Sequence, residues 1–84
     1  MFECDFKVVS CRSLTSKDGK SYVKLVTEDL DNTEYRCNDF GDLFRGLIGV
    51  TSGTLIRCQM YHTIDYKTGG RTSRINDYEI LMEV

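Results

Sequence analysis

Apolar and polar residues alternate with a period of two along most of this chain, and no other feature constrains its fold as strongly. Phe2, Cys4, Phe6 and Val8 alternate with polar neighbours, and the pattern then shifts phase at Val9. Alternation of this kind is typical of strands with one buried face, and a phase shift within a strand indicates a β-bulge. We therefore expect a long, bent first strand.

Four further strands are expected from the same reasoning. The second follows a turn at Asp18 and Gly19, and the third follows a polar turn in which Asp and Asn side chains can bond the backbone. The expected positions of these four strands are residues 22–28, 35–37, 54–65 and 75–84. The first three strands should form a meander, and the fifth should place Tyr78, Ile80, Met82 and Val84 on one face.

Residues 39–47 break the strand pattern. Their apolar side chains recur at helical spacing, at Phe40, Leu43, Phe44 and Leu47. Asn38 or Asp39 can cap a short helix here, although two glycines weaken it, so it must be held by tertiary packing. We expect Phe40 and Phe44 to pack this helix against the strands.

The resulting order is three strands, a short helix and two long strands within a single domain of 84 residues. This order predicts an all-β OB-fold, a five-stranded Greek-key barrel with a short helix between strands 3 and 4. An SH3-like barrel is the main alternative, but it does not normally carry such a helical segment. The OB-fold binds its ligands on strands 2 and 3 and on the 1–2 and 4–5 loops, which here are "SKDGKS" and "YKTGGRTS".

Basic residues are concentrated in and beside these two loops, which hold five of the eleven Lys and Arg residues. Strands 2 and 3 add two more cations, and three tyrosines are placed to stack on bases. Cations that follow phosphates and rings that stack on bases are the means by which proteins bind single-stranded nucleic acid. The predicted nucleic-acid-binding residues are Lys17, Lys20, Tyr22, Lys24, Arg36, Tyr61, Tyr66, Lys67, Arg71 and Arg74.

Two observations favour a more ordinary interpretation of these residues. Glycine and lysine are common in any exposed hairpin turn, and tyrosine is common in strands. The net charge of −2 also provides no general attraction for nucleic acid, so binding would depend on a local basic patch, with the acidic residues on other surfaces.

Catalysis and metal binding have little support in the sequence. The four cysteines form no CxxC pair, and we expect reduced thiols in the core. His62, the single histidine, falls on the apolar side of the fourth strand, where a buried, hydrogen-bonded histidine is expected. We predict no enzymatic activity, no catalytic residue, no metal and no cofactor. The N-terminus lacks the features of a secretory signal, so a cytoplasmic location is expected.

The "DGKSY" turn, with Gly19, Lys20 and Tyr22, and the glycines at the tip of a long C-terminal hairpin resemble the single-stranded-DNA-binding proteins of filamentous bacteriophages, the gene V protein type. The resemblance implies cooperative, sequence-independent coating of single-stranded DNA during replication, with a homodimer as the unit. It gives Lys20 the basic role and Tyr22 the aromatic role in the first hairpin. It assigns the hairpin around residues 67–74 to DNA or to the dimer interface. The acidic charge and the helical segment depart from this family.

The sequence therefore favours sequence-independent binding of single-stranded DNA, with RNA as a variant, in phage or plasmid DNA replication. The alternative is an OB-like protein-interaction module that uses exposed strand edges, Leu55, Tyr61 and the helix aromatics, as a subunit or host-directed factor.

Overall fold

The computed structural model describes residues 1–83, and these residues form five β-strands with almost no helix. The elements are β1 (Phe2–Thr15), β2 (Ser21–Glu28), β3 (Glu34–Asp39), the 3-10 turn η1 (Arg45–Leu47), β4 (Leu55–Ile64) and β5 (Arg71–Met82). All neighbouring strands are antiparallel, in the order β3-β2-β1-β4-β5. The molecule is therefore one open, all-β sheet whose two edges are β3 and β5.

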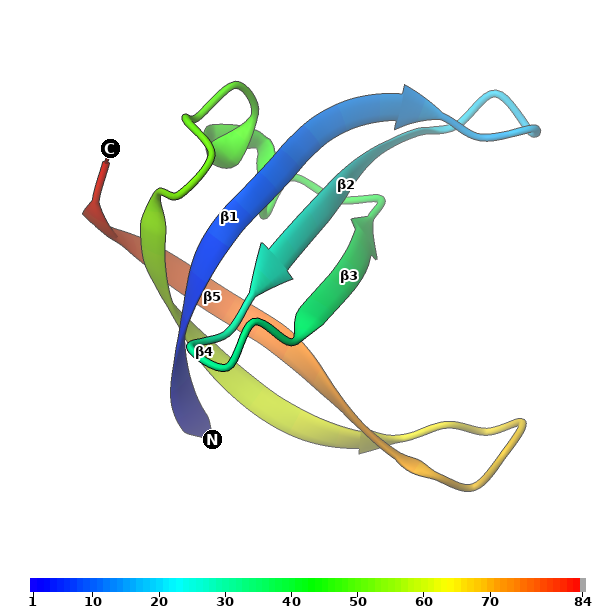
Figure 1. The fold of residues 1–84 in the computed structure, drawn as a ribbon. Coiled ribbons are helices and arrows are strands. Elements are labelled where there is room, and N and C mark those ends of the chain that lie inside the picture. Colours follow the sequence, from blue (N-terminus) through cyan, green and yellow to red (C-terminus); the bar gives the residue numbers. More distant parts are fainter. Residues whose placement is uncertain (84) are drawn as a thin grey trace.

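Strand β1 holds the sheet together because it pairs on both sides (Figure 1). Its first half, from Phe2 to Lys7, pairs with β4, and its second half, from Lys7 to Thr15, pairs with β2. The register of β1 with β2 shifts between Val8 and Ser10, which confirms the predicted bulge. Because a bulge bends its strand, β1 curves between the two halves of the sheet.

The predicted meander of the first three strands is confirmed, and the strand boundaries differ most in β3 and at the start of β5. Strand β3 is twice as long as expected, with six residues. Strand β5 begins at Arg71 rather than residue 75, because the turn before it closes within residues 65–70: the backbone N–H of Asp65 donates to the Gly70 carbonyl, and the Asp65 carbonyl accepts from Gly69. Arg71 and Arg74 therefore lie on a strand and not in a loop. Val84 of the expected fifth strand lies outside the described residues.

The helix expected at residues 39–47 is replaced by turns and the three-residue 3-10 turn η1. The Asp39 carboxylate accepts the backbone N–H groups of Gly41 and Phe44, which folds the segment back on itself instead of starting an α-helix. A Cβ at Gly46 would lie 2.7 Å from the Tyr78 hydroxyl, so any other residue here would require the Tyr78 side chain to move.

One hydrophobic core lies on the concave side of the sheet. It contains Phe6, Val8, Cys11, Val23, Leu25, Phe44, Leu47, Ile56, Cys58 and Met60. The strands supply most of these side chains, and the segment after β3 adds Phe44 and Leu47. Burial of these two side chains fixes that segment against the end of the sheet.

Candidate nucleic-acid interface

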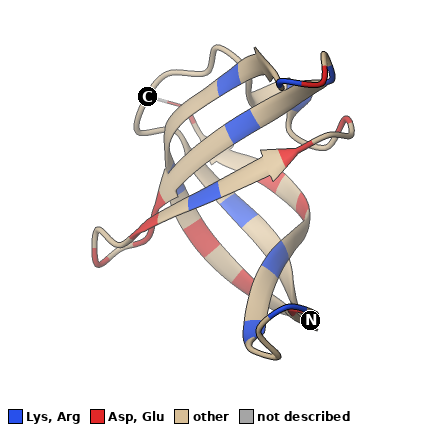
Figure 2. Cartoon of the chain, turned by 90° about the vertical axis from the view of Figure 1, so that its right-hand side faces the viewer, with Lys and Arg blue, Asp and Glu red and all other residues tan. Residues whose placement is uncertain are grey.

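The outer faces of β1, β2 and β3 carry a row of polar and cationic side chains. Arg12 on β1 lies directly opposite Lys24 on β2, and Lys24 lies opposite Asn38 on β3. Arg36 lies two residues before Asn38, on the same face of β3. Because neighbouring strands are about 4.8 Å apart, this row crosses the sheet nearly perpendicular to its strands. Figure 2 shows a basic position on each of these three adjacent strands.

An apolar row runs beside the cationic row, displaced from it by two residues along β1 and β2 and reaching just beyond the end of β3. Leu14 lies opposite Tyr22, and the ring of Tyr22 stacks on that of Phe40, with centroids 5.1 Å apart and an interplanar angle of 29°. Phe40 is 60% exposed, so this aromatic pair remains open to solvent. Alternate residues of one strand face are about 6.8 Å apart, which places the rings one side-chain spacing from the cations.

The charges on the outer face are mostly free to bind a ligand. Within residues 1–83, ion pairs engage only three cations: Arg36 with Glu34, Arg45 with Asp42, and Arg57 with Asp5 and Glu3. Arg12 and Lys24 form no ion pair within that part of the chain. Several acidic residues are gathered at the β2–β3 turn (Figure 2). Tyr22 lies near the other end of β2. This separation of charge gives an acidic protein a local basic surface.

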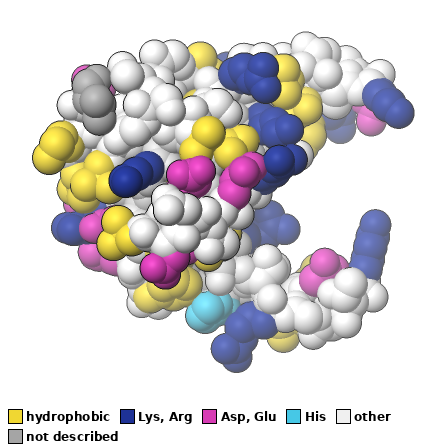
Figure 3. Space-filling model, viewed as in Figure 1, with side chains coloured by type: hydrophobic (Ala, Val, Ile, Leu, Met, Phe, Trp, Pro, Cys, Tyr) yellow, Lys and Arg dark blue, Asp and Glu magenta, His cyan; other side chains and the backbone are white. Residues whose placement is uncertain are grey.

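The two long hairpins extend from the same side of the molecule, and the surface is hollowed between them, with Lys and Arg side chains along the rim (Figure 3). The β1–β2 turn is closed by two backbone hydrogen bonds of Ser16, which donates to the Lys20 carbonyl and accepts from the N–H of Gly19, and Gly19 has a φ of 79°. A positive φ of this size favours glycine, as the sequence predicts for this turn. Lys17 and Lys20 are therefore exposed on a closed turn.

The tip of the β4–β5 hairpin is exposed. Gly69 has a φ of 70°, and the Asp65 carboxylate accepts the backbone N–H of Lys67. Tyr66 is fully exposed, with a relative accessibility of 103%. Tyr66 and Lys67 thus lie at the end of a projecting hairpin, apart from the two rows on β1, β2 and β3.

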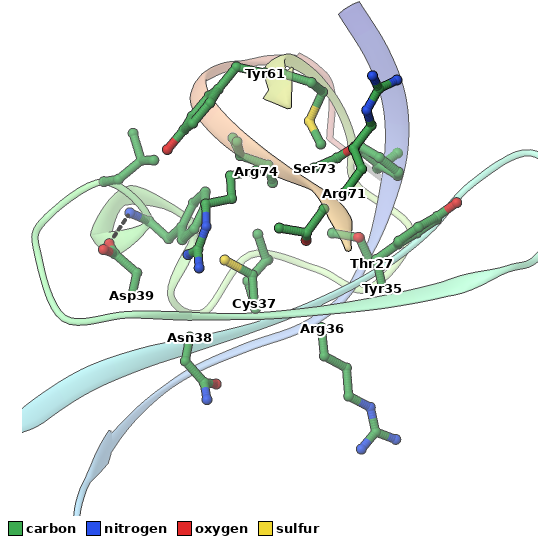
Figure 4. Close-up of a pocket in the computed structure, with 17 residues that line it drawn as sticks. Thr27, Tyr35, Arg36, Cys37, Asn38, Asp39, Tyr61, Arg71, Ser73 and Arg74 are labelled. Carbon is green, nitrogen blue, oxygen red and sulfur yellow. Dashed lines mark hydrogen bonds between the residues drawn. The ribbon is translucent and has the colours of Figure 1, made fainter. Parts of the chain in front are cut away.

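A groove of about 780 Å³ lies on the opposite side of β3, between the free edges of β3 and β5. Tyr61, Arg71 and Arg74 line this groove. Figure 4 shows Tyr35 and Cys37 on the groove side of β3, whereas Arg36 and Asn38 point to the other side. The structure therefore places Tyr22, Lys24 and Arg36 on one face of the sheet but puts three other predicted residues on a separate surface.

His62 is exposed, which corrects the expectation that it is buried. Its Nδ1 lies 3.2 Å from the Ser73 hydroxyl, and its ring stacks on Phe2 with centroids 4.7 Å apart. The cause is the length of the β4–β5 hairpin, which continues past the core so that alternation no longer implies burial.

Two residues of the outer face were missed in the sequence. The sequence does not show that Arg12 lies opposite Lys24, because this pairing depends on the strand register beyond the bulge. Phe40 was assigned to packing, yet it is exposed, whereas Phe44 is buried as expected. One feature of the sequence does indicate their position: if the alternation of β1 continues past Cys11, Arg12 and Leu14 point outward.

The cysteines are all free thiols, of which Cys11 and Cys58 are buried and Cys4 and Cys37 are half-buried. Burial, with smaller effects of neighbouring charges, raises the pKa of Cys58 to about 12. In the part of the chain that the structure describes, no three His, Cys, Asp or Glu side chains are grouped to hold a metal ion. None of the helical turns within residues 1–83 has the length and apolar character needed to span a membrane.

Comparisons with known proteins add no relative. The sequence matches no model of a protein family and no curated protein, and the fold matches no solved structure.

Proposed function

We propose that this protein is a five-stranded Greek-key barrel of the OB-fold type that binds single-stranded DNA on the outer face of β1, β2 and β3. The observation that carries this proposal is the pair of adjacent rows on that face, one with Arg12, Lys24 and Asn38, beside which lies Arg36, and the other with Tyr22 and Phe40. A cationic row can follow the phosphates of one strand while the bases of the same strand stack on the aromatic row.

Strand order also supports the OB-fold. In that fold, β1 pairs with both β2 and β4, and the ligand crosses β2 and β3 between the 1–2 and 4–5 hairpins. The pairings of β1 here are the same, and both hairpins border one hollow (Figure 3). We place the DNA across the three strands, with Lys17 and Lys20 at one end of its path and Tyr66 and Lys67 at the other.

The preference for a single strand follows from the chemistry of the aromatic row. Bases of a duplex are already stacked and paired, so their faces are not free to contact Tyr22 and Phe40. An unpaired strand exposes those faces, and each stacked base contributes about 1–3 kcal/mol. Because rings accept any base, binding should be largely independent of sequence.

The test is a titration of labelled oligothymidine, about 30 nucleotides long, followed by fluorescence anisotropy at low and physiological salt. Binding should weaken as salt rises, since phosphate contacts release counterions, and unlabelled duplex should compete poorly. An RNA competitor of equal length distinguishes the two nucleic acids. Absence of binding at low salt, or equal competition by duplex, would refute the proposal.

A further inference from the structure

The groove between β3 and β5 is bordered by two strand edges that have no partner within residues 1–83. The strand order ends at β3 on one side and at β5 on the other, and no backbone hydrogen bond of the described chain joins them. Edges of this kind present rows of N–H and C=O groups that can pair with another strand.

The residues that line the groove indicate that strand backbone is exposed in it, as well as side chains. Five consecutive residues of β3, 35–39, and five consecutive residues of β5, 71–75, border it. Successive side chains of a strand point to opposite faces, so only an edge can present an unbroken run of residues. Each run spans about 17 Å, which is the length of five residues of extended peptide.

The charge of the groove is basic. Arg71 and Arg74 form no ion pair within the described part of the chain, and both line the groove. The acidic residue on its border is Asp39, and its carboxylate already accepts two backbone N–H groups, from Gly41 and Phe44. The two arginines are thus left to attract a negatively charged ligand.

The floor of the groove is apolar. It is formed by the core side chains Phe6, Leu25, Phe44 and Met60. A strand laid in the groove would point alternate side chains toward this floor and toward solvent, so apolar residues would suit one face and acidic residues the other.

We propose that this groove binds an extended, acidic peptide segment of a partner protein, which adds a strand between β3 and β5. Main-chain hydrogen bonds to the two edges hold the peptide, the positive charge of Arg71 and Arg74 attracts its carboxylates, and its alternate apolar side chains contact the floor. Nucleic acid would stack less well along the β3 edge of this groove. Tyr35, the aromatic residue on the β3 edge, already packs on Phe6 and bonds the Asp29 carboxylate through its hydroxyl.

The probe for this proposal is a fluorescein-labelled peptide of eight residues that alternates glutamate with valine. Its control is the same peptide with lysine in place of glutamate. We expect saturable anisotropy with the glutamate peptide and none with the lysine peptide. Amide hydrogen exchange, followed by NMR, should slow at residues 34–39 and 71–75 when the glutamate peptide is present, because strand addition protects edge amides.

Charge-reversed variants locate the site. Arg71→Glu and Arg74→Glu should each weaken binding of the glutamate peptide at least tenfold, whereas Lys7→Glu, with the same change in net charge, should alter it less than twofold. Lys7 lies on β1 outside the groove. Circular dichroism of each variant establishes that the fold is retained.

The competing occupants give different results. Saturating oligothymidine should leave the peptide bound, since the proposed DNA path lies on the other side of β3. Displacement of the peptide by oligothymidine would assign the groove to nucleic acid and overturn the proposal. Absence of binding at about 1 mM glutamate peptide and low salt, or equal binding of both peptides, would also overturn it.

Discussion

The ring of Tyr22, at the start of β2, stacks on the ring of Phe40, the residue that follows β3, with centroids 5.1 Å apart. The pairing of Val23 with Asp39 brings them together, since the residues on either side of that pair then meet on the outer face. Eighteen positions separate the two rings in sequence, and only the β2–β3 register makes them one surface.

Removal of the Tyr22 ring should weaken DNA binding without unfolding the protein. Tyr22→Ala is expected to reduce affinity for oligothymidine about tenfold, which corresponds to roughly 1.4 kcal/mol and lies within the usual range for one stacked base. Tyr61→Ala is the matched control, because Tyr61 lines the groove and not the outer face. An equal loss in both variants, measured by anisotropy, would place the DNA elsewhere.

Arg12 and Lys24 should each contact about one phosphate. Arg12→Ala or Lys24→Ala is expected to reduce the slope of log affinity against log salt concentration by about 0.7, the value for one phosphate of a single strand. Lys7→Ala should leave the slope unchanged, because Lys7 lies far from the proposed interface, opposite Glu28 at the other end of β2 in the strand register. Slopes that are identical in all three variants would remove Arg12 and Lys24 from the interface.

Phe40 and Phe44 should contribute very differently to stability although they lie in one short segment. Phe44 is 1% exposed and Phe40 is 60% exposed. Phe44→Ala should lower the free energy of unfolding by about 3–5 kcal/mol, and Phe40→Ala by less than about 1 kcal/mol. Urea denaturation measures both. Similar losses for the two variants would contradict the packing of this segment.

The ion pair between Asp5 and Arg57 should make stability depend on pH. Arg57 donates from Nε and Nη2 to the two carboxylate oxygens of Asp5, at 2.9 and 3.3 Å, and this hydrogen bonding lowers the pKa of Asp5 below 3.8. A lowered pKa means that the stabilisation is present above the ordinary pKa and is lost as pH falls through the folded value.

Asp5→Asn should therefore be less stable than the wild type at neutral pH, and the difference should shrink on acidification below 3.8. Urea denaturation at pH 7 and in a series of acidic buffers measures the two free energies of unfolding. A difference that stays constant through the acidic range would show that the ion pair does not contribute.

Cys58 should resist alkylation in the folded protein. Its pKa of about 12, against an ordinary value of 9.0, makes its thiolate about 1000-fold scarcer at a given neutral pH, and its side chain is fully buried. Iodoacetamide followed by mass spectrometry should label Cys58 only in denaturant, where the four cysteines should react at similar rates. Rapid labelling of Cys58 without denaturant would contradict this environment.

Local features of the fold could be predicted from the sequence because they depend on neighbouring residues. The phase shift at Val9 correctly indicated the bulge in β1. The turn at residues 29–34 was expected to be closed by side chains, and the Asp29 carboxylate accepts the N–H groups of Asp31 and Thr33. In each case the feature results from interactions between residues that are close together in the sequence.

The segment after β3 could not be predicted in the same way. Helical spacing of its apolar residues was an accurate sign that some of them are buried, yet the segment is not an α-helix. Backbone bonds to Asp39, burial of Phe44 and the contact of Gly46 with Tyr78 determine its shape. These contacts outweigh the intrinsic preference of so short a segment.

The sequence by itself determined that the chain forms alternating strands with one apolar face, because the period of two is a local property of the backbone. The tertiary structure alone decided which side chains share a surface: Arg12 with Lys24, Tyr22 with Phe40, and Arg74 with the edge of β3. The physical reason is that the strand pairings that set the register join residues far apart in the sequence, and a shift of one residue would turn every side chain to the other face.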